Sequence, residues 1–216
     1  MTEAMIEIHN LSFEVDGQKI IKDVDLTINE GDFLTIMGPS GSGKSTLLKL
    51  IGLQTDFTSG SIQFKGKDVS DYNPTEYRKE VSYFFQNAVL FGKTVRDNLS
   101  FPAQIREETF DEARAIEGLK EVQLPTDYLD KEINDLSGGE RQRVALIRNM
   151  MYPPKVLLMD EVTSSLDREN RENILAYVKR LNEKNNTTIL WVTHNQDEID
   201  ASDRLIEIVN GKLEEN

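Results

Sequence analysis

The sequence contains no cysteine, which excludes disulfide bonds, thiolate metal ligands and a cysteine nucleophile. It also has no run of about 18 apolar residues, the length that a helix needs to cross a bilayer. The longest stretches without a charged residue, Val81 to Gly92 and Asn185 to Gln196, have only 12 residues each. The first seven residues carry acidic side chains where a secretory signal needs a basic region and an apolar core, so we expect a chain that is not exported.

Positive charge is scarce as well, because 25 lysines and arginines face 38 acidic residues and the formal net charge is −13. Nucleic-acid binding depends mostly on neutralising phosphates, so this balance argues against direct binding of DNA or RNA. Much of the acidity lies between Arg106 and Asp135, where we expect a solvated helical surface. With 38% hydrophobic and 29% charged residues, the 216-residue chain has the composition of one globular domain.

The apolar pattern predicts strands that alternate with helices, which indicates an α/β fold with a mainly parallel sheet covered on both faces. The first two expected strands, which are separated by Asp16-Gly17, predict an antiparallel pair. Beyond Phe91 the pattern changes to short helical segments, so we expect one domain over residues 1–216, with a core of about 1–86 and 137–216 and a helical insert of about 87–136. The strands are expected at 5–15, 20–28, 33–37, 61–64, 81–85, 156–160, 188–193, 204–209 and 212–214, and the helices at 45–53, 74–79, 95–104, 109–119, 140–151, 168–182 and 196–201.

A glycine-rich segment between a buried strand and a helix matches the phosphate-loop pattern of nucleotide-binding proteins. It consists of Gly38, Pro39, Ser40, Gly41, Ser42, Gly43, Lys44, Ser45 and Thr46. The glycines allow consecutive N–H groups to turn inward toward phosphate oxygens, Lys44 adds a positive charge, and the Ser45 hydroxyl can bind Mg²⁺. A glycine-rich turn with a chance lysine is the alternative, but the strand before it and the helix after it favour a nucleotide site.

Two adjacent carboxylates, Asp160 and Glu161, end the apolar strand expected at 156–160. In a parallel sheet this strand end lies beside the phosphate loop. Asp160 could then hold Mg²⁺, directly or through water, and Glu161 could polarise an attacking water molecule. An isolated acidic pair after a strand is more often a helix cap or a solvated turn. The phosphate loop upstream favours the catalytic interpretation.

A histidine and a glutamine end two further strands of the expected sheet. His194 follows the strand at 188–193, so its imidazole would emerge at the same edge as the carboxylates and could donate a hydrogen bond to a γ-phosphate. Gln86 follows the strand at 81–85, and its amide could contact a water that attacks or that binds Mg²⁺. A lone histidine is more often structural, and an isolated glutamine has little predictive value. Both predicted roles therefore depend on the position of these residues at the ends of strands.

A second glycine-rich turn, within Leu136 to Arg143, comes directly before the helix expected at 140–151. Ser137, Gly138 and Gly139 would place a hydroxyl and free N–H groups at the helix N-terminus, where anions are favoured. The sequence therefore predicts a second phosphate-binding element, far along the chain from the first.

These motifs, in this order and over essentially the whole chain, resemble those of the nucleotide-binding subunits of ABC transporters. Residues 38–45 resemble the Walker A motif, 136–142 the signature motif and 156–161 the Walker B motif. Gln86, Ser165-Leu166-Asp167 and His194 are similar to the Q-loop, the D-loop and the switch histidine. The resemblance implies an α/β P-loop NTPase core with a mainly parallel sheet, an N-terminal antiparallel β-subdomain and an inserted helical subdomain.

The same resemblance implies an ATPase that uses ATP and Mg²⁺. Glu161, His194 and Gln86 would be its catalytic residues. Ser45, Gln86 and Asp160 would contact Mg²⁺. A nucleotide-binding scaffold without turnover is disfavoured, because the candidate base Glu161 is present.

The resemblance also implies an ATP-dependent head-to-tail homodimer. ATP bound at Lys44 of one subunit would be closed over by Ser137, Gly138 and Gly139 of the other, with Asp167 at the seam. A transmembrane permease would be the second partner. We therefore expect a cytoplasmic protein at the inner face of the cell membrane, in contact with the membrane only through the permease.

Two positions depart from the usual family pattern. Val15 stands two positions after Phe13, where the family usually has an aromatic residue that stacks on adenine. Ser165 replaces the usual alanine of the D-loop, which is a mild change. An apolar contact from Val15 or a shifted Phe13 would have to replace the stacking.

Three segments, residues 90–106, 146–149 and 190–194, are similar to the Fet-type ATPase subunits associated with iron export. Any iron would be handled by the permease, since nothing in these segments forms a credible iron site. The alternative function is that of a non-transport, single-cassette ABC ATPase that regulates a membrane complex such as a cell-division assembly.

Overall fold

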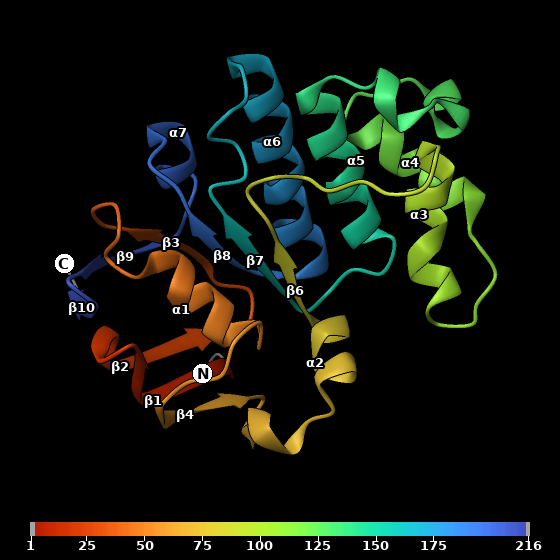
Figure 1. The fold of residues 1–216 in the computed structure, drawn as a ribbon. Coiled ribbons are helices and arrows are strands. Elements are labelled where there is room, and N and C mark those ends of the chain that lie inside the picture. Colours follow the sequence, from red (N-terminus) through yellow and green to blue (C-terminus); the bar gives the residue numbers. More distant parts are fainter. Residues whose placement is uncertain (1–2, 215–216) are drawn as a thin grey trace.

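A six-stranded sheet forms the centre of the computed structural model, which describes residues 3–214 (Figure 1). Its strands are β3 (Phe33–Met37), β6 (Val81–Phe84), β7 (Val156–Asp160), β8 (Thr188–Val192), β9 (Arg204–Val209) and β10 (Lys212–Glu214). They lie in the order β10-β9-β3-β8-β7-β6, and every neighbouring pair is parallel except the edge hairpin β9–β10. The predicted α/β class with a mainly parallel sheet is therefore confirmed. Residues 1–2 and 215–216, which belong to the predicted domain and, in part, to the stretch used to argue against export, lie outside the described residues.

A second, antiparallel sheet holds β1 (Ala4–Val15), β2 (Gln18–Asn29), β4 (Ser59–Phe64) and β5 (Lys67–Asp68). Its order is β2-β1-β4-β5. Asp16 and Gly17 connect β1 to β2 with φ values of 51° and 78°, a two-residue turn that matches the right-handed twist of the strands. The antiparallel pair expected at the N-terminus is present, and two strands that follow the phosphate loop in the chain complete its sheet.

The helices are α1 (Lys44–Ile51), α2 (Pro74–Glu80), α3 (Val95–Gln104), α4 (Glu112–Glu121), α5 (Gly138–Met150), α6 (Arg168–Asn185) and α7 (Gln196–Ile199). Short polar side chains set most of their starts by accepting backbone N–H groups. These caps are Asn73, Thr94, Asp111, Ser137, Asp167 and Asn195. Between residues 3 and 214, no helix is both long and apolar enough to span a bilayer.

Two apolar layers cover the two faces of the six-stranded sheet, and alternate residues of β3, β6, β7 and β8 enter alternate layers. Leu158 and Leu190 pack with α1 and the antiparallel sheet, whereas Leu157 and Trp191 pack with the helices on the other face. Because both faces are buried, β3, β7 and β8 consist almost entirely of apolar residues. The sheet is thus held rigidly, and its strand ends are fixed positions for functional side chains.

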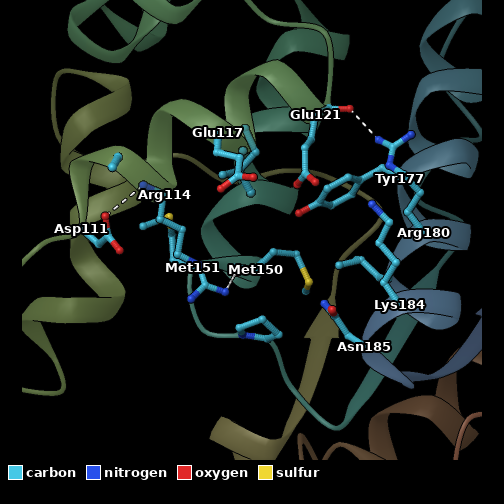
Figure 2. A pocket seen from close by; sticks show the side chains of 15 residues that line it. Asp111, Arg114, Glu117, Glu121, Met150, Met151, Tyr177, Arg180, Lys184 and Asn185 are labelled. Carbon is cyan, nitrogen blue, oxygen red and sulfur yellow. Dashed lines mark hydrogen bonds between the residues drawn. The ribbon is translucent and has the colours of Figure 1, made fainter.

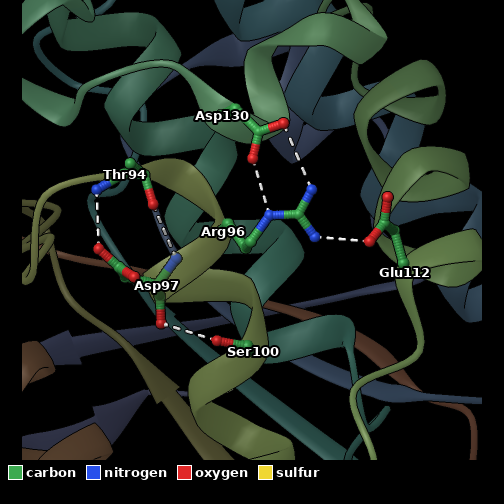
Figure 3. Close-up of polar contacts among 6 residues, drawn as sticks. All are labelled: Thr94, Arg96, Asp97, Ser100, Glu112 and Asp130. Carbon is green, nitrogen blue, oxygen red and sulfur yellow. Dashed lines mark hydrogen bonds and ion pairs between the residues drawn. The ribbon is translucent and has the colours of Figure 1, made fainter.

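The segment between β6 and α5 carries α3, α4 and two 3₁₀ turns, Thr126–Asp130 and Ile133–Asp135. Arg96 of α3 joins the parts of this segment by ion pairs to Asp130 at 2.7 Å and to Glu112 at 2.5 Å (Figure 3). Its guanidinium holds the pKa of Asp130 below the usual value. Thr94 and Asp97 cap α3 reciprocally.

A cavity of about 440 Å³ lies between α4, α5 and α6 (Figure 2). Arg180 donates to the carbonyl oxygen of Glu121 at 2.8 Å, and Arg114 donates to that of Met150 at 3.3 Å, so two arginines bridge its walls. Burial raises the pKa of Tyr177, whose ring forms part of the lining. Its lining includes Ile147 of the segment 146–149 but no residue of the phosphate loop, the glycine-rich turn at 136–143 or the strand-end motifs.

Candidate functional site

The parallel strands bring the predicted site residues to one edge of the sheet. β3 and β7 both pair with β8, so the phosphate loop after β3, the carboxylates at the end of β7 and the histidine after β8 share that edge. Asp160 pairs with Val192, and the N–H of Glu161 donates to the carbonyl oxygen of Val192 at 3.0 Å. The edge therefore carries residues from three separate motifs.

The phosphate loop encloses a hollow of about 190 Å³ that is lined by residues 40–46, Ile20 and Glu161. Its sharp entry needs glycine: Gly38 has a φ of +135°, and a Cβ there would lie 2.1 Å from the carbonyl oxygen of Ile208. Lys44 is only 5% exposed and donates to the carbonyl oxygens of Gly38 and Pro39 at 2.8 and 2.9 Å. An ammonium group has three N–H donors, so one remains available for a phosphate oxygen.

Asp160 is fixed through both of its carboxylate oxygens. Oδ1 accepts a hydrogen bond from the Ser45 hydroxyl at 2.8 Å, and Oδ2 accepts one from the Tyr83 hydroxyl at 2.7 Å. Burial and the bond to Asp160 raise the pKa of Tyr83, so its hydroxyl stays protonated and continues to donate. A serine hydroxyl beside a single carboxylate fits Mg²⁺, which needs few protein ligands when phosphates and water complete its shell.

Sequence reasoning did not identify Tyr83. The residue lies on β6, paired with Leu158 of β7, and its place between apolar residues of that strand looks from the sequence like ordinary core packing. The only signal in the sequence is the tyrosine hydroxyl itself, because a buried hydroxyl of this kind usually has a hydrogen-bond partner.

Glu161 and His194 face one another across the sheet edge. His194 Nε2 lies 3.6 Å from Glu161 Oε1, and a hollow of about 240 Å³ opens beside them. Glu161 has a left-handed backbone, with a φ of 48°, which is uncommon for a residue other than glycine. Such strained positions persist when the surrounding structure holds them, and they cluster at functional sites.

The glycine-rich turn at the start of α5 has a structure that differs in part from the expectation. Ser137 forms a capping box with Glu140, in which Ser137 Oγ accepts from the Glu140 N–H at 3.2 Å and the Ser137 N–H donates to the Glu140 carboxylate at 2.7 Å. The N–H of Ser137 is therefore occupied. Gly138 and Gly139 begin the helix, where N–H groups have no intrahelical acceptor, and the Ser137 O–H can still donate.

Gly139 brings the starts of α5 and α6 together. A Cβ at this glycine would lie 2.7 Å from Cγ of Asn170, so a larger residue would displace the Asn170 side chain. Asn170 in turn donates to Asp167 from its backbone at 2.9 Å and from its side chain at 2.6 Å. Asp167 therefore lies beside the turn formed by Ser137, Gly138 and Gly139, which we call the signature turn. Ser137, Gly138 and Asp167 are all exposed.

The signature turn and the phosphate loop line different hollows. Ser137, Gly138, Gly139 and Asp167 line one of about 380 Å³, which shares no lining residue with the hollow of the phosphate loop. Gln86 lies in the signature hollow, where its side-chain amide donates to Ser164 at 3.2 Å. Gln86 therefore does not contact Ser45 or Asp160 in this arrangement, and contact with the predicted metal site requires its side chain to turn.

Val15 and Phe13 have different environments at the end of β1. Val15 is 45% exposed, whereas Phe13 packs against the core between the two sheets. Of the two, Val15 is the side chain available for an apolar contact with a bound base.

The family model for ABC transporters matches residues 21–164 of the chain. The probable iron export ATP-binding protein FetA of Escherichia coli (strain K12) is 44% identical over 202 residues, which cover 94% of this chain and 90% of that protein. The spermidine/putrescine import ATP-binding protein PotA of Clostridium novyi (strain NT) is 36% identical over 219 residues, and the chain spans 62% of its length. The dimeric post-hydrolysis structure of the ATP-binding cassette MJ0796, bound to ADP and Pi, has a TM-score of 0.87 and 31% identity, and the match covers 97% of each chain.

Proposed function

The chain belongs to the ABC transporter family as an ATP-binding, ATP-hydrolysing subunit, and on that premise we propose that it works as a head-to-tail homodimer that drives transport through a separate membrane permease. The observation that carries this proposal is the division of the phosphate-binding elements between two hollows with no shared lining residue. One chain supplies two unlike halves of a site, and a second copy in the opposite orientation supplies the missing half of each.

Within each composite site, Lys44 and the loop N–H groups bind the phosphates. Ser45 and Asp160 would hold Mg²⁺, which when bound would supply positive charge to offset the charge developing on the phosphate oxygens. Glu161 accepts a proton from the attacking water, and His194, 3.6 Å away, donates to the γ-phosphate. Ser137 and Gly138 of the second copy donate to the same phosphate group from the other side. Hydrolysis removes the group that both copies bind, so it separates them.

Tyr83→Phe is expected to raise the Mg²⁺ concentration required for ATP binding by about tenfold, because Asp160 loses the donor that orients its second oxygen. Binding of a fluorescent ATP analogue, titrated with Mg²⁺, measures the effect without turnover. The matched control is Tyr77→Phe, which removes another buried hydroxyl, one that donates to the Ile51 carbonyl at 2.7 Å. An identical Mg²⁺ dependence in both variants would contradict the role of Tyr83.

A groove of about 310 Å³ between α2 and α3 supports the permease as partner. Four basic residues line it, and its lining contains no acidic residue, although the whole chain has a net charge of −13. Phe101 and Ile105 of the same groove are 39% and 55% exposed. An apolar segment with acidic side chains at the cytoplasmic face of a permease would match both properties. The basic residues are Arg78, Lys79, Arg106 and Arg148.

Ile105→Glu combined with Arg106→Glu is expected to abolish co-purification with the permease, because it places negative charge in the groove. ATP binding should stay unchanged, since the phosphate loop lies elsewhere. Ile105→Leu with Arg106→Lys is the matched control. The measurement is affinity purification from detergent-solubilised membranes, with identification of a recovered protein that has several membrane-spanning segments. Equal recovery by both variants would contradict the groove, and recovery of a division complex instead would favour the regulatory alternative.

We propose iron as the transported substrate and export as the direction. The support is the 44% identity to a protein named for probable iron export over nearly the whole of both chains. The polyamine importer named above is less similar and is matched over only 62% of its length. ATP-dependent movement of iron across vesicles that contain the identified permease tests the proposal, with the Glu161→Gln subunit as the inactive control. Transport of a polyamine and not iron would overturn it.

A further inference from the structure

A buried carboxylate lies directly beneath the hollow that contains Glu161 and His194. Glu198 of α7 is 1% exposed, and its two oxygens each accept a hydrogen bond from a threonine. Oε1 accepts from Thr163 Oγ1 at 2.6 Å, and Oε2 accepts from Thr193 Oγ1. Both threonines are also buried. Three buried polar side chains thus form one hydrogen-bonded cluster, in which the carboxylate has a partner for each oxygen.

The two threonines belong to the two loops that carry the reacting side chains. Thr163 lies two residues after Glu161, and Thr193 comes directly before His194. Asn195 completes the link, because its N–H donates to Thr193 Oγ1 at 3.0 Å and its side chain caps α7, the helix that carries Glu198. Glu198 and its helix therefore link the two loops, in addition to the bond between the Glu161 N–H and the Val192 carbonyl oxygen.

We propose that Glu198 is a positioning residue for ATP hydrolysis, which joins the loop after Glu161 to the loop that bears His194. The carboxylate fixes the distance between the general base and the histidine, so the two loops respond to the γ-phosphate as one unit. This inference rests on the roles proposed above for Glu161 and His194.

The energetics favour a positioning role over simple packing. Burial raises the pKa of Glu198, and the two threonine hydroxyls and the positive charge of Arg171 oppose that shift. An apolar side chain of similar volume would avoid this cost of desolvation. A carboxylate can receive the two hydroxyls on separate oxygens, so its chemistry matches the task of joining two loops.

Glu198→Ala is expected to lower kcat by about 100-fold, because an error of about 1 Å in the position of reacting groups has an effect of that size. The KM for ATP should change by no more than about twofold, since Lys44 and its loop still bind the phosphates. Glu198→Gln should keep kcat within about threefold of the wild type, because its amide can accept from one threonine and donate to the other.

Thr163→Val and Thr193→Val cut one link each and keep the side-chain volume. Each is expected to lower kcat by about tenfold at unchanged KM, because each removes one hydrogen bond to a charged group. Thr35→Val is the matched control, because Thr35 is a fully buried threonine of β3 whose hydroxyl has no partner within residues 3–214. These variants also decide the question if Glu198→Ala does not fold.

Combination with His194→Ala separates positioning from lost stability. If Glu198 acts through the two loops, Glu198→Ala should have less than a third of its usual effect on log kcat once the histidine is absent. Wild-type kcat in folded Glu198→Ala, Thr163→Val and Thr193→Val, or full additivity with His194→Ala, would overturn the inference. Unchanged hydrolysis in Glu161→Gln would instead refute the proposed function, so the two failures are distinguishable.

Discussion

Glu161→Gln is expected to lower ATP turnover by at least about 100-fold, because the amide cannot accept a proton from the attacking water. ATP affinity should remain within about twofold of the wild type, since the phosphates contact Lys44 and the loop and not this side chain. Steady-state phosphate release and equilibrium binding of an ATP analogue measure the two quantities. Glu172→Gln is the control, because it makes the same change at an exposed position on α6.

The same variant should accumulate a dimer in the presence of ATP. Both copies bind the γ-phosphate, and the variant cannot remove it, so the closed state persists. Light scattering after size-exclusion chromatography should give twice the monomer mass of 24.6 kDa with ATP and the monomer mass with ADP. Hydrolysis at the wild-type rate would show that another group acts as the base, and a monomer with bound ATP would contradict the composite site.

The parallel core could be predicted closely because its signals are local. The strands predicted at 33–37 and 156–160 have the same bounds in the structure, because each is a short apolar run with clear ends. The first ends at the glycine-rich loop, and the second lies between two prolines and a carboxylate. The short strand β5 was missed, and the place of β4 in the antiparallel sheet was not foreseen. Both depend on pairing between segments distant in the chain, which local pattern does not encode.

The candidate site could be predicted where a residue ends a strand, and not where burial defines it. Asp160 ends one apolar strand and His194 follows another, so the topology alone places them at one edge. Glu198 stands in the polar start of the helix expected at 196–201, and only the fold shows that it is buried. Side-chain orientation was also beyond the sequence, as the contact between Gln86 and Ser164 shows.

Lys44→Ala and Ser137→Arg should each abolish hydrolysis, for different reasons. The first removes the charge that contacts phosphate and should weaken ATP binding by roughly 10- to 100-fold. Lys49→Ala, an exposed lysine on the same helix, is its control. The second leaves the phosphate loop intact, so this subunit should still bind ATP while its signature hollow is blocked by a long side chain. Normal hydrolysis by Ser137→Arg alone would exclude a role for the signature turn.

Mixing the two inactive subunits then tests whether each site is shared. In a mixed dimer, the intact Lys44 of one copy meets the intact Ser137 of the other, so one competent site forms and the second site has both defects. An equal mixture should recover about a quarter of the wild-type rate, since half of the dimers are mixed and each has one of two sites. If hydrolysis needs both sites, the mixture stays inactive. The same pair with Glu161→Gln added resolves that case, because an ATP-dependent mixed dimer should still accumulate, whereas a site contained within one chain would produce none.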